Sequence, residues 1–310
     1  MKRLGIYGGT FDPIHLGHIR SAEAFYDAMC LDELLIMPTF ISPHKQMRKG
    51  DDPAYRLEMA ALAFEGNRRS IRVSDYEISK GGKSYTYLTL EHFAGEDTEL
   101  FFLMGTDMLL CLDKWRNAPR IFELATVVLA RREADADVSP KLEEAKTRYR
   151  ELYGAKIEEL VLDPTELSSS QVREAVMNGG DASALVCPAV AEYIKAYKLY
   201  DVDELYSAVR EQMPKKRLRH VFSTTDEALR LAELCGLDKE QTESLRIAAA
   251  LHDITKYYTV SEHTEYLEGR GVTVDSDTLK SEKTLHQMSG ALVRRFTVSS
   301  VSPKYCLLSE

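Results

Sequence analysis

The feature that most restricts how this chain can fold is the alternation of short apolar segments with helical patterns. The segments 33–39, 100–105 and 126–132 are apolar over most of their length, and stretches with helical spacing lie between them. Strands that bury both faces are typical of a parallel sheet with helices packed on either side. The sequence therefore predicts an α/β fold with a doubly wound parallel sheet over residues 1–200.

The sequence pattern changes near residue 200, where strand-like segments end. From Asp203 onward only helical periodicity remains, and the basic, proline-broken stretch 213–220 precedes a long helical pattern. We therefore expect two domains, the α/β domain over 1–200 and an all-α domain over 201–310, with the boundary near Asp201. In the first domain, further strands are expected at 3–7, 71–78 and 157–163, and helices at 16–29, 53–64 and 85–93.

The composition excludes several classes of protein. The chain has 40 Lys and Arg against 49 Asp and Glu, a formal net charge of −9, which does not support general nucleic-acid binding. It has no apolar run near the roughly 20 residues needed to cross a bilayer, and we do not expect the short, glycine-interrupted stretch MKRLGIYGGT to act as a secretory signal. Its 5 cysteines are scattered without a C-x-x-C pair, which is typical of reduced thiols. We expect a cytoplasmic protein that binds neither nucleic acid nor membrane; whether it forms a homo-oligomer stays open.

The stretch GGTFDPIHLGH, from Gly8 to His18, follows the first expected strand and leads into the first expected helix. Glycines after a strand let the backbone approach a phosphate, and the helix start offers that phosphate unpaired N–H groups and a positive dipole end. Thr10 adds a hydroxyl donor. His15 and His18 lie at i and i+3 on one face, where two imidazoles can stabilise charge that develops at phosphorus.

Two other interpretations of the histidine pair are open. His18 can serve only to cap or pack the helix start, as a lone histidine commonly does. A metal site is the second alternative, although Asp12 is the one nearby carboxylate and no cysteine completes the set of ligands. The agreement of the glycines, the strand-to-helix context and the spacing favours the phosphate site.

A second helix start, LSSSQVREAV at 167–176, carries a related signal. Ser168 or Ser169 can cap the helix, and Arg173 follows within one turn. A capped helix start with a forked guanidinium suits the β- and γ-phosphates of a nucleotide, although a plain N-cap is the ordinary role of such serines. We expect Ser169, Ser170 and Arg173 to face the phosphates.

The first stretch resembles the signature G-T-F-D-x-x-H-x-G-H of the nucleotidyltransferase superfamily, and the second resembles its I-S-S-T-x-I-R element. In that superfamily, whose fold is Rossmann-like, the two histidines bind the triphosphate and the transition state; the resemblance gives this role to His15 and His18. Three more stretches are similar to those of bacterial nicotinate-nucleotide adenylyltransferases: SPHK at 42–45, KSYTYLTL at 83–90 and FFLMGTDML at 101–109. They follow the family's order across the first domain.

This resemblance implies a role for each matched residue. Considered without it, Trp115 is as well suited to the core, Lys45 to a solvated loop and Asp107 to a helix N-cap. The implied catalytic residues are His15, His18 and Arg173; the implied ATP-binding residues are Gly8, Gly9, Thr10, Phe11, Lys45, Gly105, Asp107, Ser169 and Ser170; and the implied residues for the mononucleotide are Tyr85, Thr86, Trp115 and Arg131 or Arg132.

The implied reaction is adenylyl transfer from ATP to nicotinate mononucleotide, which yields nicotinate adenine dinucleotide and pyrophosphate in NAD biosynthesis. Because the substrate phosphate is already a nucleophile, positioning and charge stabilisation carry the rate. Mg²⁺ would accompany the ATP phosphates with few protein ligands. The alternatives are adenylyl or cytidylyl transfer to another phosphate substrate, such as phosphopantetheine, and a nucleotide-binding sensor without turnover.

The second domain holds a further cluster of ionisable residues. His252 and Asp253 are adjacent in the apolar helical stretch 245–256, where two such groups are costly unless they are paired or bind a metal. With His220 upstream and His286 downstream, the order resembles the HD superfamily of metal-dependent phosphohydrolases, closest to the branch that hydrolyses dinucleoside tetraphosphates. The resemblance implies that these four residues hold a divalent Fe, Mn or Mg ion that activates water. A satisfied buried His–Asp pair is the alternative.

This second resemblance is incomplete. HD sites take a further His and a final Asp from later helices, and no His or Asp follows His286. The tail 294–310 has no helical apolar period, so we expect a truncated domain with disorder or swapped packing there. Hydrolysis of dinucleotides is therefore expected to be poor or absent.

Overall fold

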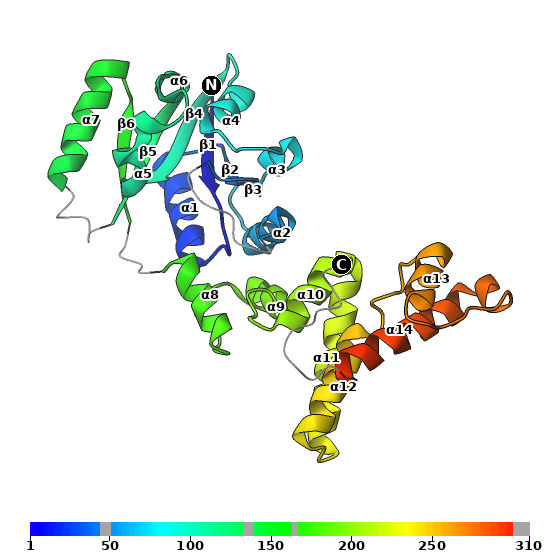
Figure 1. The fold of residues 1–310 in the computed structure, drawn as a ribbon. Coiled ribbons are helices and arrows are strands. Elements are labelled where there is room, and N and C mark those ends of the chain that lie inside the picture. The colour runs from blue at the N-terminus through cyan, green and yellow to red at the C-terminus, as the bar shows by residue number, and fades with distance from the viewer. Residues whose placement is uncertain (44–50, 133–138, 163–166, 300–310) are drawn as a thin grey trace. The chain divides into compact units, whose positions relative to one another are not determined.

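The computed structural model describes residues 1–310 except 44–50, 133–138, 163–166 and 300–310 (Figure 1). The chain divides into two compact units, Met1–Glu192 (unit 1) and Tyr193–Glu310 (unit 2). The division falls inside helix α9 (Pro188–Ala196), slightly before the boundary near Asp201 that the sequence suggests. Within the described ranges, no helix is both long and apolar enough to cross a bilayer.

Unit 1 is built on a six-stranded sheet in the order β3-β2-β1-β4-β5-β6, and every neighbouring pair is parallel. This is the order of a doubly wound Rossmann-like sheet, in which the winding reverses between β1 and β4. The predicted α/β architecture is therefore confirmed for unit 1. The strands are β1 (Lys2–Gly9), β2 (Glu33–Pro38), β3 (Ile71–Val73), β4 (Thr98–Gly105), β5 (Ala125–Arg132) and β6 (Ile157–Leu162).

The helices expected in unit 1 at 16–29, 53–64 and 85–93 are present, but one expected strand is wrong. The segment 71–78 is not a single strand, because β3 ends at Val73 and a short helix begins at Tyr76. Ser74 accepts a hydrogen bond from the backbone N–H of Tyr76 (3.3 Å), which turns the chain into the helix. The helices are α1 (Leu16–Ala28), α2 (Pro53–Phe64), α3 (Tyr76–Lys80), α4 (Thr86–Phe93), α5 (Thr106–Leu110), η1 (Leu112–Lys114), α6 (Ala118–Leu124), α7 (Ser139–Tyr153) and α8 (Ser169–Met177).

The sheet is buried on both faces, which explains why its strands are apolar throughout. On one face, Leu4, Ile6 and Phe102 pack with buried side chains of the helices that follow β4, such as Phe122 and Tyr149. Successive side chains of a strand point to opposite faces of the sheet. All six residues of β2 and five consecutive residues of β4 are buried, so the other face is covered as well. Both faces therefore contribute to the core.

Gly5 shows how closely α1 approaches the other face. A Cβ atom on Gly5 would lie 2.4 Å from Cδ1 of Leu31 and 3.1 Å from Cε1 of Phe25. A larger residue at position 5 would require these side chains to move, so glycine allows the close packing of Phe25 and Leu31 on β1.

In the part of unit 2 that the structure describes, helices are joined by turns and loops, and no strand is present. Helix α14 (Glu282–Ser299) continues past residue 294, so the tail that was expected to lack helical structure is helical up to Ser299. Once a helix has begun, each added residue gains a hydrogen bond at little further cost, which favours such an extension. Residues 300–310 lie outside the described ranges. The other helices are α10 (Glu204–Gln212), α11 (Lys215–Leu234), α12 (Lys239–Leu251), α13 (Val260–Glu268) and η3 (Thr278–Lys280).

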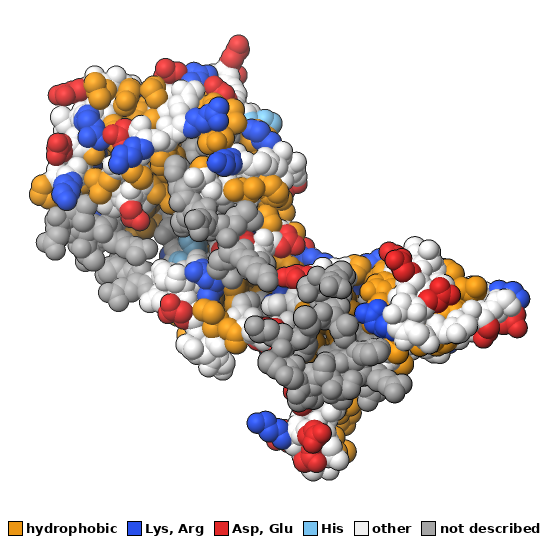
Figure 2. All heavy atoms as spheres, in the orientation of Figure 1, with side chains coloured by type: hydrophobic (Ala, Val, Ile, Leu, Met, Phe, Trp, Pro, Cys, Tyr) orange, Lys and Arg blue, Asp and Glu red, His pale blue; other side chains and the backbone are white. Residues whose placement is uncertain are grey.

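Charged side chains of both signs are interspersed over the described part of the face shown in Figure 2, without a single large basic patch. This distribution agrees with the negative formal charge of the chain.

Candidate active site

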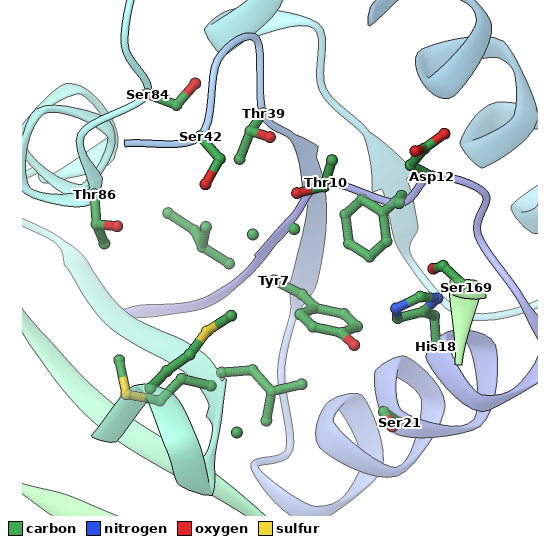
Figure 3. A pocket seen from close by; sticks show the side chains of 18 of the residues that line it. Tyr7, Thr10, Asp12, His18, Ser21, Thr39, Ser42, Ser84, Thr86 and Ser169 are labelled. Atoms are coloured by element: carbon green, nitrogen blue, oxygen red, sulfur yellow. The ribbon is translucent and has the colours of Figure 1, made fainter. Parts of the chain in front are cut away.

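A cavity of about 970 Å³ lies at the carboxyl ends of β1 and β4, where the winding of the sheet reverses. This edge is the usual ligand site of open parallel sheets, and the volume suits a nucleotide and a second substrate. Figure 3 shows Thr10, Thr39, Ser42 and Thr86 around one part of the cavity, with His18 and Ser169 close to each other in another. The lining comes from the loops after β1 and β2 and from the starts of α1, α4, α5 and α8.

His15 and His18 form a stacked pair at the start of α1. Their ring centroids are 3.6 Å apart, and the backbone N–H of His15 donates to Nδ1 of His18 (3.2 Å). A Cβ atom on Gly17 would lie 3.0 Å from two atoms of the His15 ring, so glycine at 17 leaves room for that imidazole. Both histidines line the cavity, which places two imidazoles where the sequence expects a phosphate.

The two motifs meet in space. Ser169 donates from its hydroxyl to the carbonyl oxygen of Pro13 (2.9 Å), and Arg173 donates from Nη1 to the carbonyl oxygen of Asp12 (2.6 Å). Ser168, not Ser169, caps α8, since its hydroxyl accepts from the backbone N–H of Gln171. This leaves Ser169 and Arg173 at the cavity, where α8 is held against the loop that precedes the histidine pair.

The start of α4 forms another part of the wall. Tyr85 is the N-cap residue of α4, and Ser84 holds the loop after β2 through two hydrogen bonds. The hydroxyl of Ser84 accepts from the N–H of Phe40 (3.0 Å), and its own N–H donates to the carbonyl of Ile41 (2.9 Å). The start of α4 and the loop after β2 are therefore fixed to each other.

Asp107 and Trp115 also line the cavity. Gly105 is the N-cap residue of α5 and Asp107 is exposed in the first turn, so Asp107 does not act as the cap. Trp115 is half-buried and packs at the edge of the core while it also faces the cavity. The packing interpretation of Trp115 and the ligand interpretation are thus compatible.

Comparison with known proteins identifies the family. Residues 6–175, more than half of the chain, match the cytidylyltransferase-like family. Over 200 residues the chain is 37% identical to a probable nicotinate-nucleotide adenylyltransferase of Clostridium botulinum (strain Eklund 17B / Type B), covering 64% of this chain and 98% of that protein. The chain belongs to the cytidylyltransferase-like family and, within it, to the nicotinate-nucleotide adenylyltransferases. It is therefore an enzyme.

Two further matches agree with this family. A probable nicotinate-nucleotide adenylyltransferase of Clostridium beijerinckii is 38% identical over 206 residues, which cover 64% of this chain and all of that protein. Among solved structures, Plasmodium falciparum nicotinic acid mononucleotide adenylyltransferase complexed with NaAD matches with a TM-score of 0.52. At 17% identity, over 66% of this chain and 99% of the other, that match shows the fold alone.

Three residues that the resemblance assigns to this family's site are not placed at the cavity. Arg131 lies on β5, and its guanidinium is 3.6 Å from the carboxylate of Glu159 on β6. The side chain of Arg132 and the whole of Lys45 are outside the described residues. The roles of Arg131, Arg132 and Lys45 in binding phosphate stay predictions.

Arg56 is a site residue that sequence reasoning missed. Its side chain is 2% exposed and pairs with Asp51 (2.8 Å). It donates to the backbone carbonyls of Thr10 (2.8 Å), Thr39 (2.7 Å) and Phe40 (3.1 Å), which belong to two loops that line the cavity. An arginine inside the apolar helical stretch 53–64 was the available signal, because a buried guanidinium needs several acceptors.

Glu77 is a second missed residue of the lining. It is 8% exposed, and the hydroxyl of Thr89 donates to its carboxylate (2.6 Å). Burial raises the pKa of Glu77, because the ionised carboxylate is poorly solvated there, and hydrogen bonds from Thr89 and Ser84 oppose that shift. The helical α3, which the sequence suggests only as part of a strand, positions this carboxyl.

In unit 2 the structure brings together all four residues that the sequence suggests as metal ligands. Nε2 of His220 lies 3.4 Å from Nε2 of His252, and 3.9 Å from Asp253. His252 and His286 approach the same carboxylate at 3.6 and 3.5 Å. Side-chain atoms of His220, His252 and Asp253 lie within 4.8 Å of one another, close enough to share one ion. Metal binding itself stays a prediction.

Two cations compete for the Asp253 carboxylate. Arg217 forms an ion pair with Asp253, and Nζ of Lys256 lies 3.4 Å away. Burial lowers the pKa of His220 and of His286, and neighbouring cations, Arg217 at His220 and Lys256 at His286, lower both further. Neutral imidazole is the form that binds a metal ion, so this environment suits ligation by the histidines.

Proposed function

We propose that unit 1 transfers the adenylyl group of ATP to the phosphate of nicotinate mononucleotide and releases pyrophosphate. The observation that carries the proposal is the meeting of the His15–His18 pair with Ser169 and Arg173 at one cavity. The names of the curated relatives support these substrates.

The chemistry follows from the groups at the cavity. An oxygen of the mononucleotide phosphate attacks the α-phosphorus of ATP, the bond between that phosphorus and the α–β bridging oxygen breaks, and pyrophosphate leaves. The attacking oxygen is already ionised, so no strong base is required. His15, His18 and Arg173 would donate hydrogen bonds to oxygens that gain charge in the transition state.

Mg²⁺ is expected to enter with ATP. Asp12 and Asp107 line the cavity and supply the hard carboxylate oxygens that Mg²⁺ prefers. An ion that enters with ATP takes most of its ligands from phosphate oxygens and water, so one carboxylate of the lining is enough to fit it. When bound, the ion neutralises phosphate charge. In this proposal Asp12 has a second role, because its backbone carbonyl orients Arg173.

A panel of acceptor substrates with ATP tests this function. We expect dinucleotide formation and pyrophosphate release with nicotinate mononucleotide, and little with phosphopantetheine. Preferred turnover of phosphopantetheine would replace the proposed substrate. Tight ATP binding without any pyrophosphate release would instead favour a nucleotide sensor.

We infer a second function for unit 2: a divalent metal site of the HD type, held by His220, His252, Asp253 and His286. Three imidazoles and a carboxylate suit Mn²⁺ or Fe²⁺, and their convergence on Asp253 supports the assignment. The ion pair of Asp253 with Arg217 argues for weak catalysis, because it occupies the carboxylate that a metal ion would need. Metal content and diadenosine tetraphosphate cleavage test this: bound Mn²⁺ with slow cleavage is expected, and brisk cleavage would contradict it.

A further inference from the structure

Three buried polar side chains form a row of hydrogen-bonded contacts that begins at the four-residue cluster of unit 2. Thr255 and Ser289 are fully buried, and His263 on α13 is 1% exposed. Their polar atoms are linked in sequence: Nδ1 of His263 lies 2.9 Å from Oγ of Ser289, which lies 2.9 Å from Oγ1 of Thr255. Oγ1 of Thr255 then lies 3.1 Å from Nδ1 of His286. We refer to Thr255, Ser289 and His263 as the relay residues.

The relay residues are a costly feature in a small helical core. A buried hydroxyl or imidazole costs free energy unless each polar atom finds a partner, and an apolar residue at 255 or 289 would avoid that cost. The motif His220, His252–Asp253, His286 does not require them, because none is a member of the cluster. Their placement therefore indicates that they support a neighbouring residue.

That neighbour is His286, whose two ring nitrogens face different surroundings. Nε2 lies 3.5 Å from Oδ1 of Asp253, on the side of the cluster. Nδ1 lies against Thr255, on the side of the relay residues. A histidine that ligates a metal through one nitrogen commonly donates its other N–H to a fixed acceptor, which sets the tautomer and the orientation of the ring.

Resting on the metal site proposed for unit 2, we propose that the relay residues position His286 as a metal ligand. A hydroxyl donates one hydrogen bond and accepts others, so Oγ1 of Thr255 can accept both from the Nδ1–H of His286 and from the hydroxyl of Ser289. Thr255 in turn donates to the carbonyl oxygen of His286 (3.4 Å), and Oγ of Ser289 accepts from the Nδ1–H of His263. In that arrangement each hydroxyl proton has an acceptor, and the Nε2 lone pair of His286 points toward the cluster. Thr255, Ser289 and His263 are positioning residues and do not touch the ion.

The test is Mn²⁺ binding to the full chain, measured by isothermal titration calorimetry. Thr255→Val removes the hydroxyl with little change of shape, and Ser289→Ala breaks the link to His263. Loss of such a partner typically weakens metal affinity about 10–100-fold, and we expect that range for both variants. Thr255→Ser keeps the hydroxyl and should restore an affinity close to that of the wild type.

A matched control separates this role from general destabilisation. Thr225 on α11 is equally buried, but its hydroxyl donates to the carbonyl of Val221 in its own helix (2.8 Å). Thr225→Val should therefore leave Mn²⁺ affinity unchanged. In a His286→Gln background, Thr255→Val should have no further effect on affinity, because its effect passes through His286.

Each outcome decides between the proposals. Wild-type affinity in Thr255→Val, or an equal loss in the His286→Gln background, would overturn the positioning role and leave the metal site in place. Failure of the wild-type chain to bind Mn²⁺ would overturn the metal site and the positioning role together.

Discussion

At the scale of single residues, the site of unit 1 depends on side chains held by backbone groups from distant parts of the chain. Arg173 donates to the carbonyl of Asp12, and Ser169 donates to that of Pro13. The stacked imidazoles of His15 and His18 need the small residue between them. Their positions are therefore set before substrate binds, which is the condition for effective stabilisation of a transition state.

His18→Ala should reduce kcat for adenylyl transfer about 10²–10³-fold, because one preorganised donor to the developing charge is lost. Steady-state kinetics measure the change, and circular dichroism checks that the variant is folded. His92→Ala is a matched control, since His92 is an exposed imidazole stacked on Tyr76 (3.9 Å between ring centroids) and does not line the cavity. Wild-type turnover in folded His18→Ala would contradict the role of the pair.

Glu77→Gln should stabilise the protein more at about pH 8 than at pH 4.5, the ordinary pKa of Glu. Because burial raises the pKa of Glu77, its contribution to stability is complete below 4.5 and is lost as the pH rises through the raised value. Gln keeps an oxygen that accepts from Thr89 and does not ionise. Thermal unfolding of both proteins at the two pH values measures the effect. An equal difference at both would show that Glu77 does not titrate as described.

At the level of elements, two connections hold the walls of the cavity in unit 1. The start of α2 links the loop after β1 to the loop after β2, and the start of α4 holds the loop after β2. Arg56 makes the first connection and Ser84 the second. These elements lie far apart along the chain and meet only because the parallel sheet brings the carboxyl ends of β1 and β2 to one edge. The shape of the cavity is therefore a property of several elements together.

Arg56→Met should lower the free energy of unfolding by about 3–5 kcal/mol, because it leaves a buried Asp51 without its cation and three carbonyls without a donor. Urea unfolding measures this loss. Arg69→Met is the control: Arg69 pairs with Asp27 on the surface, and an exposed pair contributes at most about 1 kcal/mol. Similar losses in the two variants would indicate that the buried hydrogen bonds and ion pair of Arg56 contribute no more to the free energy of unfolding than a surface pair does.

Unit 1 should show a higher kcat/KM for nicotinate mononucleotide than for its amide counterpart. The positive end of α4 favours a carboxylate, by about 0.3–1 kcal/mol when exposed and more when buried. The guanidinium of Arg116 lies 4.8 Å from the Tyr85 ring centroid, beside that helix start. Equal kcat/KM for the acid and the amide would contradict this assignment.

Two variants locate the source of the preference. Arg116→Gln should reduce the ratio of acid to amide turnover, because the guanidinium lines the cavity. Arg120→Gln should not, since Arg120 is paired with Glu91 and Glu123 and lies outside the lining. A reduced ratio in both variants would point to a general effect of charge.

At the scale of the whole molecule, the chain consists of two units with separate cores and separate candidate sites. The nucleotide cavity belongs to unit 1, and the cluster around Asp253 belongs to unit 2. A ligand of one unit should therefore stabilise that unit without requiring the other.

Calorimetric unfolding should show two transitions, with nicotinate adenine dinucleotide shifting one and Mn²⁺ shifting the other. A ligand at 100 times its Kd adds about 2.7 kcal/mol to the stability of the unit that binds it. His252→Ala should abolish the shift with Mn²⁺ and leave the shift with the dinucleotide. A single transition that responds to both ligands would show that the units unfold as one.

Features that depend on neighbouring residues could be predicted from the sequence. Apolar strands that alternate with helices predicted a parallel sheet, which the structure confirms. Glycines with two histidines at a strand-to-helix junction favour a phosphate site, and that site stays a prediction. The strand expected at 71–78 was wrong. The polar pair Ser74–Asp75, which ends β3 and turns the chain into α3, was the local signal for the shorter strand. Even the cluster of unit 2 could be predicted, since its residues stand at helix positions with a recognisable order.

Which distant groups meet depends on how the elements pack in the folded chain. The contacts of Arg56 with two loops, of Arg173 with Asp12, and of the relay residues with His286 join segments that are remote along the chain. No local pattern predicts them, because a buried arginine, threonine or serine has the same neighbours in sequence whether it is a structural defect or a support for a site. What distinguishes the two is the set of acceptors that the packed elements bring within reach, and that set exists only in the folded chain.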